Sequence, residues 1–144
     1  MKILDANILL YAYDSSSAHH AICRDWLQGA LNDDDPVGLP WQTSFAFIRI
    51  STNPRAVRRP LAIEDACAII SALFERPTVV VVEPGEQFWK TFVRLVAEAH
   101  VSGPLITDAV LAALALELGA CVCSTDRDFR RFEGLVVIDP TQSR

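Results

Sequence analysis

The chain has 144 residues, of which 51% are hydrophobic and 22% are charged, and its formal net charge is −5. This length suits one domain with a buried core, and the composition excludes a disordered chain. The longest apolar stretch, residues 104–120, contains Asp108 and Glu117 and is shorter than the roughly 20 residues of a membrane-spanning helix. Asp5 interrupts the apolar N-terminus, which excludes a signal peptide. We expect a single cytoplasmic domain, residues 1–144, that does not bind membranes.

The four cysteines do not form a zinc-binding motif. Cys121 and Cys123 have no second Cys or His pair at the spacing of a zinc site, and Cys23 and Cys67 stand alone. We expect all four to be small buried residues with free thiols, which suits a reducing compartment.

Strands and helices are expected to alternate along the first half of the chain. Short apolar runs predict strands at residues 2–5 and 37–39. Helical periodicity predicts helices at residues 7–13, 18–31 and 41–51, the last of which ends before Asn53-Pro54. In the second of these helices the inward stripe is predicted to comprise Ile22, Trp26, Leu27 and Ala30.

The second half continues the alternation. Amphipathic helices are predicted at residues 63–76 and 86–100, and the β-branched run at 78–82 predicts a buried parallel strand. Residues 105–118 are apolar nearly all round, which predicts a buried helix ended by Gly119. Residues 121–124 and 135–138 complete the strands. The pattern predicts an α/β fold around a parallel sheet.

Four aspartates are candidates for a site. Asp5 ends the first predicted strand and Asp126 follows the strand at 121–124, and sites in parallel sheets form at the carboxyl ends of strands. Taken singly, each could simply cap the next helix or turn. Asp108 lies near the start of the buried helix, where a carboxylate needs a partner, a cation or the helix N-terminus. Asp128 is either a ligand or a surface turn residue.

These residues offer oxygen ligands, with no cysteine or histidine near them in the sequence. Such a group suits Mg²⁺ or Mn²⁺ and points to phosphate chemistry. Glu117 is excluded, since at about 100° per residue it lies on the opposite side of the helix from Asp108.

Arginines gather in two places despite the acidic total. Residues 49–60 contain four arginines and no acid, and a second group flanks Asp126 and Asp128. The first group is Arg49, Arg55, Arg58 and Arg59, and the second is Arg127, Arg130 and Arg131. Local basic patches of this kind can hold phosphates; the alternative for the first is a solvated loop.

Taken together, five segments resemble the PIN-domain nucleases and, among them, the VapC-type toxins of bacterial toxin–antitoxin pairs. They occur in family order over nearly the whole chain, at residues 3–10, 41–49, 51–55, 107–115 and 124–129. The resemblance implies a single PIN-like domain whose parallel sheet has the order 3-2-1-4-5. It also implies a magnesium-dependent endoribonuclease, with Mn²⁺ as a substitute, that is a homodimer inhibited by a small antitoxin.

The resemblance assigns roles to individual residues. Asp5, Asp108 and Asp126 would hold the metal, and Asp128 would orient a water molecule or help to bind the ion. Asn7, Ser124 and Thr125 would contact these ligands, without touching the metal, and hold them in position. RNA would be held by Arg49, Arg55, Arg58, Arg59 and Arg127.

One position departs from the family pattern. The family's usual glutamate stands three residues before an arginine that matches Arg49, so its place is taken by Ala46. The departure leaves open a second class of function, an inactive RNA-binding protein of the same fold. A third class, a phosphatase with Asp5 as nucleophile, would usually have a second aspartate where this chain has Asn7.

Overall fold

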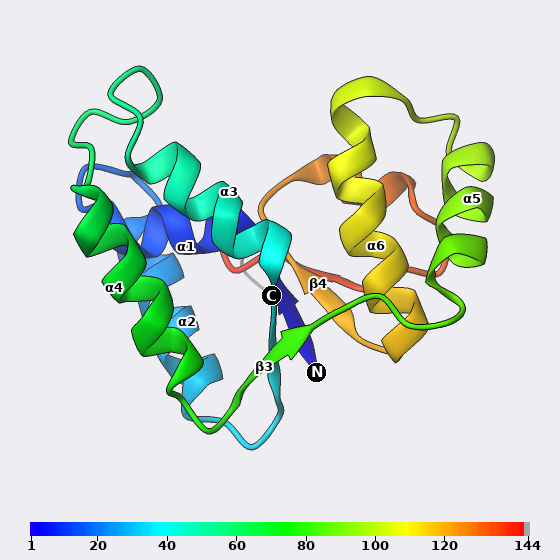
Figure 1. Ribbon diagram of the computed structural model, residues 1–144, viewed down its shortest axis with the longest axis horizontal. Helices are drawn as coiled ribbons and strands as arrows, with labels where there is room; N and C mark the ends of the chain where they lie inside the picture. Colours follow the sequence, from blue (N-terminus) through cyan, green and yellow to red (C-terminus); the bar gives the residue numbers. More distant parts are fainter. Residues whose placement is uncertain (143–144) are drawn as a thin grey trace.

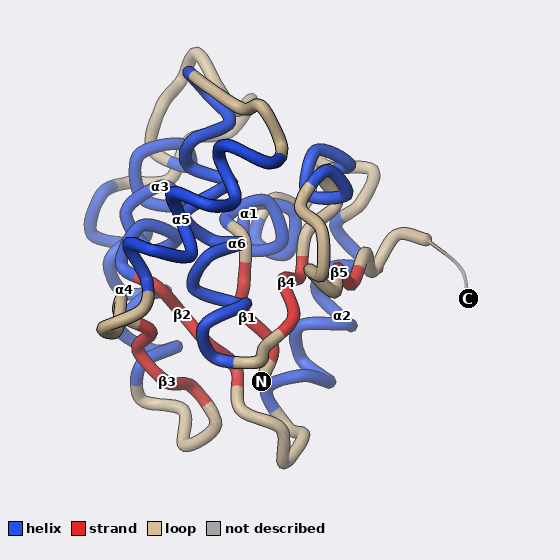
Figure 2. Tube along the Cα trace, turned by 90° about the vertical axis from the view of Figure 1, so that its right-hand side faces the viewer, coloured by secondary structure: helices blue, strands red, loops and turns tan. Residues whose placement is uncertain are grey.

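The computed structural model describes residues 1–142. Its centre is a five-stranded sheet in the order β3-β2-β1-β4-β5, which confirms the predicted order. All four strand pairs are parallel. The strands are β1 (Lys2–Leu4), β2 (Val37–Pro40), β3 (Val79–Val82), β4 (Cys121–Cys123) and β5 (Val137–Ile138). Figure 2 shows them side by side through the middle of the molecule.

Helices cover both faces of the sheet. Helices α1 to α4 gather on one side, whereas α5 and α6 lie on the other (Figure 1). The first four are α1 (Ala6–Tyr13), α2 (His20–Leu31), α3 (Trp41–Ser51) and α4 (Ile63–Phe74). The other two are α5 (Phe88–Glu98) and α6 (Ile106–Leu118), and two short 3₁₀ helices are η1 (Gly103–Leu105) and η2 (Arg127–Arg131).

Two hydrophobic cores result from this layering, because alternate residues of a strand point to opposite faces. Leu4 and Cys123 pack with α1, α2, α3 and α4 in one core. Ile3 and Val122 pack with α6 and Leu95 in the other. The sheet is therefore buried on both faces near β1 and β4, as parallel sheets generally are.

Most predicted elements are confirmed, with ends shifted by at most two residues. The buried helix at 105–118 is confirmed, since Ala109 and the run from Leu111 to Ala115 are buried. Gly119 ends it in the left-handed conformation, with φ of 61°. Glu117 lies away from Asp108 as predicted, and its carboxylate accepts hydrogen bonds from the backbone N–H groups of Gly85 and Gln87.

Three burial predictions are wrong. The strand at 78–82 is not fully buried: Val80 and Val81 are 41% and 39% exposed, because β3 is the edge strand and pairs only with β2. Ile22 is exposed, since the inward stripe of α2 is turned toward Cys23. Cys67 is exposed on α4, whereas the other three cysteines are buried or half-buried; all four are free.

The ends of β1 and β4 lie next to each other. Leu4 pairs with Cys123, and the next backbone N–H, that of Asp5, donates to the carbonyl of Cys123 at 3.0 Å. Asp5 and Ser124 therefore begin adjacent turns at one edge of the sheet. Within residues 1–142, no helix has the length and apolar character needed to cross a bilayer.

Candidate metal centre

Asp5 is fixed by hydrogen bonds to both of its carboxylate oxygens. It is the N-cap of α1, where Oδ1 accepts from the Ala6 N–H at 2.7 Å. Oδ2 accepts from the hydroxyl of Ser124 at 2.7 Å. Burial raises the pKa of Asp5, and these hydrogen bonds offset only part of that effect. The carboxylate is held in one orientation at the end of β1.

Ser124 links the two turns at this edge. Its buried hydroxyl accepts hydrogen bonds from the Asn7 side-chain amide and from the Asp126 N–H, both at 3.0 Å. Asn7 in turn accepts from the Thr125 N–H at 3.4 Å. The turn after β1 and the turn after β4 are thus joined by one network, which contains all three residues predicted to support the ligands.

Asp126 and Asp128 are positioned by η2, a helix that the sequence did not predict. Asp126 is its N-cap, and its Oδ1 accepts from the Asp128 N–H at 2.8 Å. This turn brings Asp128 round to Arg131, whose guanidinium donates to Asp128 Oδ1 at 2.7 Å. Arg131 belongs to the second arginine group, and its spacing of three residues from Asp128 in a helix is the sequence signal for this ion pair.

Asp108 completes an acidic cluster from the first turn of α6. Carboxylate oxygens of Asp108, Asp126 and Asp128 lie within 4.8 Å of one another. Burial raises the pKa of Asp108 to about 6, helped by the negative charges of Asp126, Asp5 and Asp128 and opposed by Arg131. These three residues form the acidic cluster. The negative charges near Asp108 outweigh the positive charge of Arg131.

The acidic cluster fits a divalent cation. It offers oxygen donors alone, which Mg²⁺ and Mn²⁺ prefer. Bringing three carboxylates together is unfavourable without a positive charge, and a bound cation would relieve that repulsion. The cluster differs from the ligand set implied by the resemblance in one member, since it contains Asp128 and does not contain Asp5. Each oxygen of Asp5 accepts one hydrogen bond and keeps a second lone pair, so Asp5 as a ligand stays a prediction.

A cavity of about 620 Å³, the aspartate cavity, opens in front of this edge. Its lining includes Asp5, Asp108 and Asp126 together with residues of α3. Ala46 lies on the α3 side, so the position of the departure faces the same cavity as the three predicted ligands.

Gln42, Phe45 and Thr107 also line the aspartate cavity, and the sequence analysis did not single them out. The Gln42 side chain donates to the Thr107 carbonyl at 3.0 Å and so joins α3 to the start of α6. Their only signal in the sequence is helical spacing, because Gln42 lies one turn before Ala46 on the same face.

The predicted RNA-binding arginines lie in three places. Arg49 lines the aspartate cavity. Arg55, Arg58 and Arg59 are exposed on the loop between α3 and α4, and Arg127 lies on η2 beside a second cavity. Within residues 1–142 none of these five forms an ion pair, so their charges are available to an anionic ligand.

Known proteins resemble this chain over nearly its whole length. A family model described as PIN domain matches residues 2–135. Ribonuclease VapC37 of Mycobacterium tuberculosis is 40% identical over 135 residues, which cover 94% of each chain. Ribonuclease VapC31 of the same species is 37% identical over 140 residues, covering 97% of this chain and 99% of the relative.

Solved structures share the fold at lower identity. VapC20 of Mycobacterium tuberculosis, described as a toxin that cleaves the sarcin–ricin loop, has a TM-score of 0.69 at 14% identity, covering 94% of this chain and 97% of that one. A chain of a toxin–antitoxin complex from Klebsiella pneumoniae has a TM-score of 0.67 at 14% identity, covering 99% and 100%. The domain match and the two VapC relatives place this chain in the PIN-domain family, in its VapC group.

Proposed function

We propose that the protein is a metal-dependent endoribonuclease that acts as the toxin of a toxin–antitoxin pair. The observation that carries the proposal is the convergence of Asp108, Asp126 and Asp128, of which Asp108 and Asp126 line the aspartate cavity. Relatives at 37–40% identity are named ribonucleases, and they match nearly the whole chain. The substrate class follows from those names and from the free arginines around the cavity.

The acidic cluster would hold Mg²⁺, or Mn²⁺ in its place. The bound ion would lower the pKa of an attacking water molecule and stabilise charge on the scissile phosphate. Asp126 and Asp128 are held for this task by the η2 turn, and Arg131 fixes the orientation of Asp128. Asp5 adds a third carboxylate to the cavity wall, held in place by Ser124, and would either bind the ion, directly or through water, or align the nucleophile.

Two groups of arginines would position the RNA. Arg49 stands in the wall of the aspartate cavity, close enough to guide the scissile strand. Arg55, Arg58 and Arg59 are exposed on one loop and would contact phosphates further along. Such contacts set the register of a nucleic acid without reading its sequence.

We propose a homodimer and a small antitoxin as partners. A structural neighbour is described as a toxin–antitoxin complex. Large apolar side chains are exposed at the start of α3 and on α5, among them Trp41, Phe45 and Trp89. Trp41 and Phe45 stack on each other with ring centroids 6.0 Å apart. Exposed apolar groups of this size are typical of protein interfaces.

The inactive RNA-binding protein remains the second candidate, and Ala46 favours it. The cavity has an apolar methyl group where the family usually carries a carboxylate, which leaves one ligand fewer. The phosphatase alternative is less well supported, because a phosphatase of that kind would usually have a second aspartate where this chain has Asn7.

Incubation with total cellular RNA, with Mg²⁺ and with a chelator, tests the proposal. We expect cleavage in Mg²⁺ by the wild type and by Asp25→Asn, a control that removes an exposed carboxylate from α2. Asp126→Asn should abolish cleavage while the fold is retained, as judged by circular dichroism. Cleavage by rigorously purified Asp126→Asn protein, or equal cleavage in the chelator, would refute the mechanism.

A further inference from the structure

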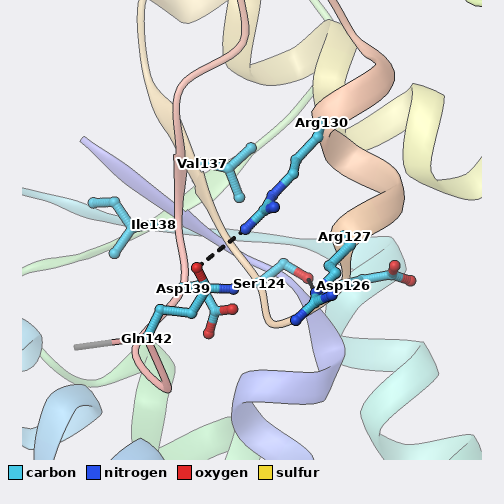
Figure 3. Close-up of a pocket in the computed structure, with 8 residues that line it drawn as sticks. All are labelled: Ser124, Asp126, Arg127, Arg130, Val137, Ile138, Asp139 and Gln142. Atoms are coloured by element: carbon cyan, nitrogen blue, oxygen red, sulfur yellow. Dashed lines mark hydrogen bonds between the residues drawn. The ribbon is translucent and has the colours of Figure 1, made fainter. Parts of the chain in front are cut away.

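A second cavity, of about 400 Å³, adjoins the acidic cluster at the carboxyl ends of β4 and β5 (Figure 3). We call it the β4–β5 cavity. Its volume lies in the range of small-ligand sites, which begins at roughly 300 Å³. Asp126 and no other member of the acidic cluster lines both cavities, so the two meet at this residue. A ligand bound at the cluster is therefore separated from the second cavity by one side chain.

Two arginines of η2 line the β4–β5 cavity. In Figure 3, Arg130 reaches across it toward the loop that follows β5, and the Asp126 carboxylate points away from Arg130. Arg130 Nη2 donates to Gln142 Oε1 at 3.1 Å, and within residues 1–142 neither Arg127 nor Arg130 forms an ion pair. A guanidinium has five N–H donors, so most of those on Arg130 remain free for an anion.

The other acidic residue that lines this cavity, Asp139, is hydrogen-bonded within its own loop. Asp139 Oδ1 accepts hydrogen bonds from the N–H and hydroxyl of Thr141, at 2.9 and 2.7 Å. The half-buried side chains of Val137 and Ile138 form an apolar wall. A cavity with free guanidinium groups beside an apolar wall fits a phosphate that carries a flat organic group, which describes a nucleotide.

We propose that the β4–β5 cavity is a subsite for the RNA unit next to the scissile phosphate. Arg127 and Arg130 bind the phosphate of that unit, and its sugar or base lies against Val137 and Ile138. The inference rests on the proposed ribonuclease function and adds a position to it. RNA is favoured over an acidic protein segment because Asp126 lines both cavities, so a strand bound at the cluster lies next to this one.

Substitution of each arginine tests the subsite. Arg127→Gln and Arg130→Gln each remove one positive charge, and Arg94→Gln on α5 is the control because Arg94 is exposed and lines neither cavity. The substrate is a short synthetic RNA that spans a cleavage site mapped in total RNA. Each subsite variant should raise KM about tenfold or more with kcat within about twofold, since charge-assisted hydrogen bonds have this strength. The salt slope of binding should fall by about 0.7 per lost contact.

A second measurement locates the phosphate. Methylphosphonate groups replace the phosphates of the RNA one at a time, which removes one negative charge at each position. One position beside the cleavage site should weaken cleavage by the wild type and by Arg94→Gln. The same replacement should cause no further loss in Arg130→Gln, because the contact is already absent.

The outcomes separate this inference from the proposed function. Unchanged KM and salt slope in active Arg127→Gln and Arg130→Gln proteins overturn the subsite and leave the ribonuclease intact. Absence of cleavage by the wild type in Mg²⁺ and in Mn²⁺ refutes the ribonuclease function. Fluorescence anisotropy with a short single-stranded RNA then tests the subsite by comparing the RNA affinity of the wild type with that of the arginine variants. Variants that keep RNA affinity but lose a co-expressed antitoxin would identify a protein-docking cavity, which also overturns it.

Discussion

The Ser124 hydroxyl donates a 2.7 Å hydrogen bond to the carboxylate of Asp5, and this contact joins the ends of β1 and β4 across a sequence separation of 119 residues. The same oxygen accepts from Asn7 and from the backbone of Asp126. One buried hydroxyl thereby fixes two acidic residues relative to each other. The geometry of the site depends on this small group as well as on the aspartates.

We predict that Ser124→Ala impairs both stability and activity. The substitution leaves the part-buried Asn7 amide and Asp126 N–H without their acceptor, which should cost about 1 kcal/mol, the lower end of the range for buried groups. Urea unfolding should show this loss, and RNA cleavage should fall because Asp5 and Asp126 are less well held. Ser102→Ala, at an exposed position, should change neither. Wild-type stability in Ser124→Ala would show that the network is replaced by water.

Asp108→Asn should have opposite effects with and without metal. In a chelator, removing one of three clustered negative charges should raise the melting temperature, because repulsion is relieved. In Mn²⁺ the wild type should gain more stability than the variant, since binding to the native state stabilises it. Thermal melts across a Mn²⁺ titration measure both effects. Equal gains in the two proteins would exclude Asp108 as a ligand.

A third prediction concerns the N-terminus and pH. Asp35 accepts from the terminal ammonium at 2.7 Å and pairs with Lys2 at 2.9 Å, and these partners lower the pKa of Asp35. A lowered pKa in the folded state means that the stabilisation is present above the unfolded pKa, about 3.9, and is lost as the pH falls through the folded value. Asp35→Asn should therefore be less stable than the wild type at neutral pH, and the difference should disappear in acid.

Asp34→Asn is the control for this measurement. Asp34 is exposed in the same loop and forms no ion pair within residues 1–142. Melts of the three proteins at neutral pH and below the aspartate pKa distinguish the specific pair from general charge effects. A constant difference between Asp35→Asn and wild type at both pH values would contradict the proposed ion pair.

The exposed arginine loop gives a fourth prediction. Replacing Arg55, Arg58 and Arg59 together by glutamine should weaken binding of single-stranded RNA of any sequence. The salt dependence should flatten by about 0.7 per lost phosphate contact. Arg94→Gln serves again as the control. An unchanged slope, measured by anisotropy at several salt concentrations, would show that this loop faces away from the RNA.

Much of the fold could be predicted because local signals and packing agree. The helix at residues 41–51 has the predicted bounds, since Asn53-Pro54 ends it. The exposure of Val80 and Val81 could not be predicted, because a β-branched run is equally typical of a central strand and an edge strand. The burial of these residues depends on the position of β3 in the sheet, which the local sequence does not indicate.

The candidate site was predictable where residues end strands and uncertain where they lie in turns. Asp5 follows β1 directly and Asp126 lies three residues beyond the end of β4, so the parallel sheet brings both to one edge. Asp128 could equally have pointed to solvent. Its position depends on its hydrogen bonds with Asp126 and Arg131, and both bonds require the helical conformation of η2.

The last prediction uses the departure at Ala46, which lines the aspartate cavity together with Asp5, Asp108 and Asp126. We expect that metal binding by the free protein is weak, because the number of carboxylates strongly affects how well Mg²⁺ is held. Ala46→Glu should add a ligand and tighten metal binding without RNA. A half-buried glutamate is also unfavourable when no cation is present, so the variant should be less stable than the wild type in a chelator.

Thermal melts across a Mn²⁺ titration decide the matter. If the new carboxylate reaches the ion, Ala46→Glu should start below the wild type and gain more stability as Mn²⁺ is added. Ala72→Glu, which introduces the same charge at an exposed position of α4, should follow the wild type at every concentration. A constant destabilisation of Ala46→Glu, independent of Mn²⁺, would mean that position 46 contributes only to packing. The acidic cluster would then bind its ion without help from α3, and the missing glutamate would not account for weak binding.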